Sequence, residues 1–115
     1  LRAKHDAVFI ATGVYKARDV ELPGAELSGV VPALDYLTAS NRKGLGDAVP
    51  EFDSGALDAA GKHVVVIGGG DTAMDCVRTA VRPGAASVTC LYRRDKANMP
   101  GSMREVKNAE EEGVT

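Results

Sequence analysis

The stretch from His63 to Ala73, which reads HVVVIGGGDTA, constrains the fold of this chain more than any other segment. Four β-favouring apolar residues run into three consecutive glycines, and an amphipathic pattern follows directly. The pyrophosphate of a dinucleotide requires a strand, a tight turn and a helix start in this order. Gly68 permits the turn, Gly70 leaves room for phosphates near the backbone, and Ala73 lets the helix pack closely on the strand. The first helical amides then face the anion.

The second half of the chain predicts a strand–helix–strand unit. A strand over 63–67 leads into a helix over 71–82, and residues 87–92 alternate as a second strand. The helix ends at Pro83, because proline cannot continue the hydrogen-bond ladder. The apolar residues of its sheet-facing stripe are Ala73, Cys76, Val77, Ala80 and Val81. A right-handed crossover then makes the strands parallel, which predicts an α/β fold: a partial Rossmann-type parallel sheet with flanking helices.

The first sixty residues give weaker signals. Residues 6–13 read as a short buried strand that ends at a glycine. Pro32 suits the first position of a helix that we expect to extend to about residue 40. Residues 41–61 are rich in glycine and are expected to form a long loop with at most one helical turn.

A further helix is expected after the second strand, over residues 103–112. Ser102 and Glu105 have the spacing of a capping box, in which each side chain bonds the backbone amide of the other residue. The expected buried face of this helix consists of Met103, Val106 and Ala109.

The end of the second strand indicates which nucleotide the turn would choose. In NAD-binding folds an acid about twenty residues after the first glycine bonds the ribose 2′-hydroxyl. Here Arg93 and Arg94 follow the strand, and guanidinium groups suit the 2′-phosphate of NADP. Asp95 leaves an NAD site open as an alternative, and the arginines could also belong to a solvated loop. The Asp71 carboxylate would lie beside the pyrophosphate, where it can instead cap the helix.

Composition sets only broad limits. The chain has 115 residues, a net charge of −2 and 44% hydrophobic residues, which favours one globular domain without a nucleic-acid or membrane partner. Because it begins at Leu1 rather than Met, we expect a piece of a longer protein. Cys76 and Cys90 are spaced neither as a C-x-x-C redox pair nor as metal ligands. Reduced buried thiols favour a cytoplasmic location, and we expect no metal site.

Several motifs together resemble a known family. ATG at 11–13, VIGGGDTA at 66–73 and YRRD at 92–95 resemble the flavoprotein reductases with two dinucleotide-binding domains, of which thioredoxin reductase is one relative. Within that group, NRKGLG at 41–46 and NMPGS at 98–102 are similar to the NADPH-dependent glutamate synthase small-chain family.

The resemblance implies a fold, a function and a division of the chain. It implies an enzyme with an FAD domain and an inserted NADPH domain, which passes hydride from NADPH to FAD. Electrons would continue through iron–sulfur clusters, outside this chain, to a large subunit that makes glutamate from glutamine and 2-oxoglutarate. Residues 1–31 would be the end of an FAD-domain strand and the inter-domain crossover, residues 32–61 a helix and long loop, and residues 62–115 the first half of the NADPH domain.

The resemblance also assigns cofactor-binding residues. At the NADPH pyrophosphate it places Gly68, Gly69, Gly70, Asp71, Thr72 and Ala73. Arg93 and Arg94 would hold the 2′-phosphate. Thioredoxin reductase relatives carry a further arginine where this chain has Asn98, so the clamp is either lighter here or completed by Lys96. Close to the flavin it places Ala11, Thr12 and Gly13. No catalytic residue is assigned, because the protein's part in hydride delivery is positioning and electrostatics.

Two alternatives remain at this point. The first is a related NADPH–flavin reductase, such as the amino-terminal half of dihydropyrimidine dehydrogenase. The second is a non-catalytic binding or assembly module, because two strands with few helices leave open sheet edges and bury a small core. We expect the chain alone to be inactive as an enzyme, and either to self-associate or to stay partly disordered through residues 41–61.

Overall fold

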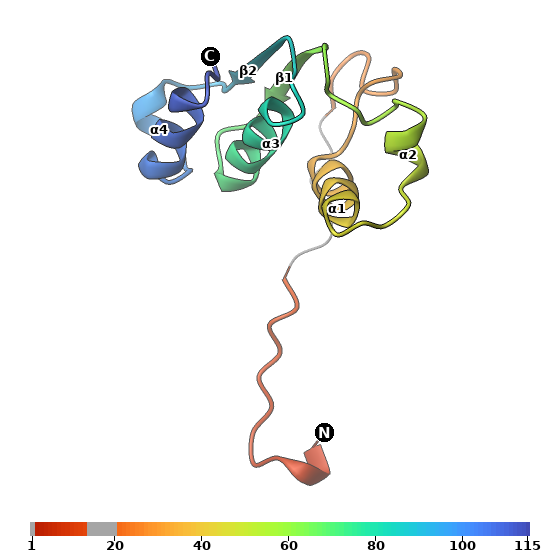
Figure 1. The fold of residues 1–115 in the computed structure, drawn as a ribbon. Helices are drawn as coiled ribbons and strands as arrows, with labels where there is room; N and C mark the ends of the chain where they lie inside the picture. Colours follow the sequence, from red (N-terminus) through yellow and green to blue (C-terminus); the bar gives the residue numbers. More distant parts are fainter. Residues whose placement is uncertain (1, 14–20) are drawn as a thin grey trace.

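A parallel pair of strands joined by a helix forms the centre of the structure (Figure 1). Strand β1 (His63–Ile67) pairs in parallel with β2 (Ser87–Leu91), and helix α3 (Asp71–Val81) connects them. These bounds lie within one residue of the predicted ones. The predicted α/β class, a partial Rossmann-type parallel sheet with flanking helices, is therefore confirmed.

The computed structural model describes residues 2–13 and 21–115. The remaining elements are the 3-10 turn η1 (Arg2–Lys4), α1 (Ala33–Gly44), α2 (Pro50–Asp53), the 3-10 turn η2 (Lys96–Asn98) and α4 (Met103–Glu111). None of the helices in these two ranges is long and apolar enough to cross a membrane.

The core lies on one face of the sheet, where α3 packs against both strands and α4 packs against α3. Met74 and Val77 of α3 and Val88 of β2 are almost fully buried there. Because side chains alternate across a strand, Val65 and Ile67 point to the opposite face and are each 60% exposed. The sheet is thus covered on one side and exposes Val65, Ile67 and Leu91 among polar residues on the other.

Helix α4 is held against α3 by apolar contacts and by an ion-pair cluster. Val106 and Ala109 are buried as predicted, but Met103 is 54% exposed, so its predicted place in the buried face is wrong. Met99 packs against the core instead, from the loop that precedes the helix. Arg78 of α3 also pairs with Glu105 of α4, at 2.6 Å from Nη1, and with Glu112 directly after α4, at 2.7 Å from Nε.

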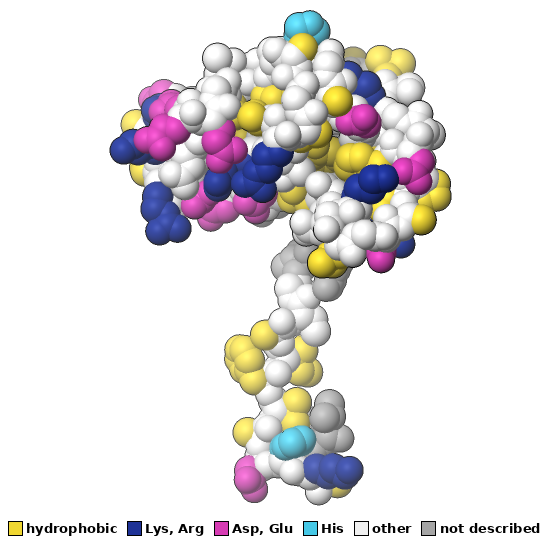
Figure 2. Space-filling model, viewed as in Figure 1, with side chains coloured by type: hydrophobic (Ala, Val, Ile, Leu, Met, Phe, Trp, Pro, Cys, Tyr) yellow, Lys and Arg dark blue, Asp and Glu magenta, His cyan; other side chains and the backbone are white. Residues whose placement is uncertain are grey.

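The polypeptide before α1 does not form the strand predicted over residues 6–13, and that prediction is wrong. Residues 5–13 have no regular secondary structure and form an arm that extends away from the folded part (Figure 1). Its hydrophobic side chains are visible along the arm in Figure 2, and Phe9 is 91% exposed. A strand requires a neighbour for its amides and carbonyls, and no described strand pairs with these residues. The expected crossover over 14–31 lies partly outside the described residues.

The segment predicted as helix 32–40 and loop 41–61 is more helical than expected. Helix α1 continues to Gly44, and the short α2 supplies the one helical turn expected in the loop. Tyr36 and Phe52 connect the two helices by a stacked contact with ring centroids 6.2 Å apart. Residues 45–49 and 54–62 remain non-helical.

The outer edge of β2 bonds the last residue of the chain. The Thr115 amide donates to the Val88 carbonyl at 3.1 Å, and the Cys90 amide donates to the Thr115 carbonyl at 2.7 Å. One residue that bonds to positions two apart on a neighbour is typical of a parallel ladder. β2 therefore lies between β1 and Thr115.

Candidate functional site

The turn between β1 and α3 places three glycines in three different environments. Gly68 adopts φ +154°, a conformation that residues with a Cβ rarely adopt. Its amide donates to the Leu91 carbonyl at 3.0 Å, which fixes the turn to the end of β2. A Cβ on Gly68 would lie 3.2 Å from the Ala73 Cβ. Small residues at both positions therefore allow α3 to pack tightly against the turn.

The amino-terminal end of α3 carries backbone amides that have no acceptor among the residues described. No side chain caps this helix, and the amides of Gly70, Asp71 and Thr72 have no acceptor among the residues described. A Cβ on Gly70 would meet no atom within 4 Å. Unpaired amides at the positive end of a helix dipole, beside unfilled space, form an arrangement that attracts an anion.

Gly69 faces the protein rather than this open space. A Cβ at Gly69 would lie only 2.6 Å from Cδ2 of Tyr92, so the tyrosine ring rests directly on the glycine backbone. The Tyr92 hydroxyl donates to the Asn98 carbonyl at 3.2 Å. Arg94 contacts the same side chain: its Nε donates to the Tyr92 hydroxyl at 3.2 Å, and its guanidinium carbon lies 5.8 Å from the ring centroid. Tyr92 thus connects the glycine turn to the arginine pair.

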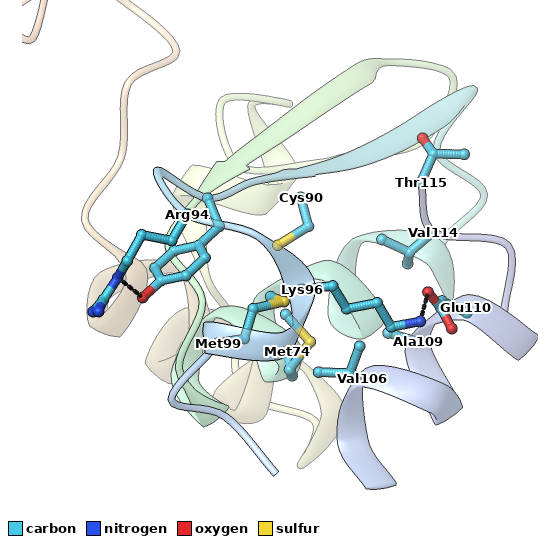
Figure 3. Close-up of a pocket in the computed structure, with 11 residues that line it drawn as sticks. Met74, Cys90, Arg94, Lys96, Met99, Val106, Ala109, Glu110, Val114 and Thr115 are labelled. Carbon is cyan, nitrogen blue, oxygen red and sulfur yellow. Dashed lines mark hydrogen bonds and ion pairs between the residues drawn. The ribbon is translucent and has the colours of Figure 1, made fainter. Parts of the chain in front are cut away.

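The two arginines have no carboxylate partner among residues 2–13 and 21–115, whereas Lys96 does. Arg93 and Arg94 are exposed, and among the described residues the Arg94 side chain hydrogen-bonds only to Tyr92. The Lys96 ammonium pairs with Glu110 of α4 (Figure 3). The structure therefore leaves two guanidinium groups available to an anion and holds the ammonium group on α4.

Asp71, the first residue of α3, is turned away from the open amides. Its Oδ1 accepts a hydrogen bond from the Ser102 amide at 2.7 Å. The capping box predicted for α4 is therefore wrong, because Ser102 makes no side-chain cap and the Glu105 carboxylate is bonded to Arg78. A residue 31 positions earlier in the chain performs the role that the local pattern assigned to Glu105.

Gly101 completes the contact between this loop and the turn. Its amide donates to the Gly69 carbonyl at 2.9 Å, and a Cβ on it would lie 3.0 Å from the same oxygen. Sequence reasoning did not identify Tyr92, Gly101 or Ser102 as contacts of the glycine turn. The available signal was the glycine of the NMPGS segment, which marks a close approach of two backbones.

The residues assigned to a flavin are not brought to this site. Ala11, Thr12 and Gly13 are exposed and lie in the amino-terminal arm, which leads away from the glycine turn (Figure 1). A Cβ on Gly13 would meet nothing within 4 Å. Taken alone, these residues provide no cradle into which a flavin fits.

A cavity of about 270 Å³ opens beside the arginine pair, between β2, α3 and α4 (Figure 3). Its floor is apolar, with Met74 and Met99, and Arg94 and Lys96 lie at its charged edge. Cys90 also lines the cavity, where burial raises the pKa of its thiol. The Cys90 thiol donates to the Gly68 carbonyl at 3.2 Å, so this wall of the cavity belongs to the same turn.

Comparison with known proteins gives one matching family and several close relatives. The family of pyridine nucleotide-disulphide oxidoreductases matches residues 1–115. The chain is 69% identical to the glutamate synthase (NADPH) small chain of Azospirillum brasilense over 99% of its own length and 24% of the relative's. It is 71% identical to a putative glutamate synthase (NADPH) small chain of Cereibacter sphaeroides, covering 99% of this chain and 27% of that one.

A relative with a different name aligns over the same share of this chain at lower identity. The putative oxidoreductase AegA of Escherichia coli is 53% identical over 99% of this chain and 17% of its own length. The chain thus spans about a quarter or less of the length of these curated relatives.

Proposed function

The chain belongs to the pyridine nucleotide-disulphide oxidoreductase family, and on that premise we propose that residues 62–115 form the first half of an NADPH-binding Rossmann domain. The pyrophosphate would bind at the turn, at Gly68, Gly69, Gly70, Asp71, Thr72 and Ala73. The 2′-phosphate would bind to Arg93 and Arg94. When bound, NADPH supplies a hydride, and this chain's residues bind and orient the nucleotide.

The observation that carries this proposal is the open amino-terminal end of α3. Three amides without acceptors in the described part of the chain lie beside a glycine at which even a methyl group would meet no described atom. A phosphate group is a suitable ligand because it accepts several hydrogen bonds and is stabilised by the helix dipole. The neighbouring residue, Asp71, directs its charge to Ser102 instead.

The choice of NADPH over NADH follows from the charge at the end of β2. Arg93 and Arg94 have no carboxylate partner within the described ranges, and Tyr92 holds Arg94 next to the turn. Asp95, which kept an NAD site open, accepts hydrogen bonds from the Asn98 amide at 3.0 Å and from Asn98 Nδ2 at 2.6 Å. A carboxylate bonded in this way favours a loop-forming role over recognition of a ribose hydroxyl. Lys96 would join the clamp only after release from Glu110.

Calorimetric titration of the purified chain with 2′,5′-ADP and, separately, with 5′-AMP tests this proposal. We expect tighter binding of 2′,5′-ADP by about tenfold or more, because hydrogen bonds between arginine and phosphate are charge-assisted. Replacing both Arg93 and Arg94 by alanine should remove the difference and leave 5′-AMP affinity nearly unchanged. Equal affinity of the unmodified chain for the two ligands, or binding of neither, would contradict the proposal.

For the whole protein, we infer a flavin-dependent oxidoreductase that passes hydride from NADPH to FAD and electrons on to iron–sulfur clusters. The 69–71% identity to glutamate synthase small chains favours glutamate synthesis from glutamine and 2-oxoglutarate with a large subunit in the cytoplasm. Ala11, Thr12 and Gly13 would approach the flavin in that longer protein. Assay of the full-length protein, with and without a large subunit, for glutamate formation from NADPH tests this assignment.

A second candidate is an NADPH–flavin oxidoreductase with a different electron acceptor. The 53% identity to a putative oxidoreductase over nearly the whole chain supports this second candidate. In that case the full-length protein would oxidise NADPH with an artificial acceptor and form no glutamate with a large subunit.

A further inference from the structure

We infer that Asp71 is a positioning residue, which holds the loop that carries the arginine pair in register with the glycine turn. This loop, residues 92–102, is called the arginine loop below. By fixing the loop, Asp71 would set the preference for a nucleotide with a 2′-phosphate. The inference rests on the proposed function, because the preference has meaning only if the turn binds the phosphates of the nucleotide.

Both ends of the arginine loop are attached to the glycine turn. At its beginning, the Leu91 carbonyl accepts from the Gly68 amide at 3.0 Å, and the Tyr92 ring rests on Gly69. At its end, the Gly101 amide donates to the Gly69 carbonyl at 2.9 Å and the Ser102 amide to Asp71 at 2.7 Å. Of these two hydrogen bonds at the end of the loop, the one to Asp71 involves a side chain, so a substitution of Asp71 can remove it.

The loop is also braced between these two ends. Asp95 Oδ1 accepts from both the backbone amide and the side-chain amide of Asn98, and the Asn98 carbonyl accepts from the Tyr92 hydroxyl at 3.2 Å. Arg94 in turn donates to that hydroxyl. A displacement of the far end of the loop is therefore transmitted to the guanidinium group through a short series of hydrogen bonds.

No other described residue takes the place of Asp71 at the Ser102 amide. Glu105 is at the position from which a capping box would bond it, but this carboxylate lies 2.6 Å from Arg78 Nη1. An acid in the first turn of a phosphate-binding helix would repel the ligand unless its charge were directed elsewhere. Its engagement with Ser102 explains how an acid can be accommodated there.

Gly101 offers a second way to displace the loop. A Cβ at this position would lie 3.0 Å from the Gly69 carbonyl oxygen and 3.2 Å from the Gly70 carbonyl carbon. Both atoms are backbone, so the clash cannot be relieved by a side-chain rotation. Gly101→Ala should therefore displace the loop from the turn by a few tenths of an ångström without removing Asp71. Gly44→Ala is its control, since a Cβ there meets nothing within 4 Å.

The test is the ratio of the dissociation constants of 5′-AMP and 2′,5′-ADP, measured by calorimetry on Asp71→Ala, Asp71→Asn and Asp75→Ala. We expect Asp71→Ala to lower the ratio by about fivefold, the equivalent of one hydrogen bond. Asp71→Asn keeps an oxygen acceptor for Ser102 and should restore the ratio. Asp75 is exposed one turn further along α3 and makes no hydrogen bond to a described residue, so its variant matches the lost charge and should leave the ratio unchanged.

An unchanged ratio in Asp71→Ala, when the unmodified chain discriminates between the ligands, would overturn the inference while leaving the proposed function intact. If the affinities for both ligands rise equally in that variant, the ratio is also unchanged, and Asp71 only repels phosphate. If Asp71→Ala does not fold, an unchanged ratio in Gly101→Ala would overturn it equally. Absence of discrimination in the unmodified chain would defeat the proposed function, and the inference with it.

Discussion

Two adjacent glycines of the turn should respond in opposite ways to the same substitution. Gly69 is buried beneath the Tyr92 ring, whereas Gly70 borders the space that we assign to phosphate. Gly69→Ala should therefore reduce the stability of the fold, and Gly70→Ala should reduce nucleotide affinity. The two variants carry the same chemical change one position apart, so each is the control of the other.

The structure gives the expected size of each effect. At Gly69 the new Cβ would lie 2.6 to 2.9 Å from three atoms of the Tyr92 ring. Overpacking of this kind costs about 1–3 kcal/mol, and each kcal/mol lowers Tm by about 4–8 °C in a small domain. At Gly70 the backbone is extended, with φ −91° and ψ 176°, and the methyl group meets no protein atom. The only cost there is the poorer N-cap, about 1 kcal/mol or less.

Nucleotide affinity should show the reverse order. A methyl group on Gly70 would occupy the space beside the free amides and keep a phosphate oxygen beyond hydrogen-bond distance. We expect at least about a tenfold loss of 2′,5′-ADP affinity in Gly70→Ala, which corresponds to one charge-assisted hydrogen bond. Thermal melts followed by circular dichroism and calorimetric titration measure the two quantities separately. Unchanged affinity in Gly70→Ala, or a lower Tm for it than for Gly69→Ala, would refute this account of the turn.

Three further predictions concern the core, the buried thiol and the uncovered sheet face. Met74 is 1% exposed, so Met74→Ala should lower the free energy of unfolding, measured in urea, by about 2–5 kcal/mol. Met103→Ala, at an exposed site, should change this free energy little. Equal losses in the two variants would contradict the described core. Burial, with a smaller contribution from Asp75, raises the pKa of Cys76 from 9.0 to about 11. The unfolded chain then loses the thiol proton at a lower pH than the folded chain does. The contribution of Cys76 to stability is therefore fully present below pH 9 and should be lost as pH rises through about 11. An equally steep fall of Tm with pH in Cys76→Ala would argue against this cause. Replacing Val65 and Ile67 together by threonine should reduce concentration-dependent self-association in sedimentation velocity, because both hydrophobic side chains are 60% exposed on the uncovered face of the sheet. Unchanged association would assign it to another surface.

The strand–helix–strand unit was predictable because each local signal pointed to the same structure. The apolar run before Gly68 and the i, i+3, i+4 stripe after it fixed β1 and α3 to within one residue. Proline after α3 and alternation from Ser87 onward determined the next two boundaries. Rules for strand connections then determined the parallel pairing.

The errors arose where a residue depends on a distant partner. Residues 6–13 have the composition of a buried strand, but a strand forms only beside another strand, and none of the described ones pairs with them. Glu105 has the spacing of a capping residue, yet its carboxylate accepts a hydrogen bond from Arg78, 27 positions earlier, instead of from the Ser102 amide. The Ser102 amide donates to Asp71. No local pattern contains these competing contacts.

The candidate site was predictable in its parts and not in its connections. The glycines and the arginine pair follow from the sequence, because their spacing after β1 and β2 is what a dinucleotide requires. The sequence does not predict the contacts that Tyr92 and Gly101 make with Gly69, because these contacts depend on how the arginine loop folds back over the turn. The pairing of Lys96 with Glu110 is likewise a consequence of the packing of α4.

Nuclear magnetic resonance of the uniformly ¹⁵N-labelled chain during titration with 2′,5′-ADP tests the central claim most directly. We predict that the largest amide shifts fall on Gly70, Asp71 and Thr72 at the start of α3 and on Arg93 and Arg94 at the end of β2. Titration with 5′-AMP should retain the first set and lose the second. Shifts confined to α1 or α2, or an identical pattern for both ligands, would contradict the assignment of an NADPH half-site to this turn.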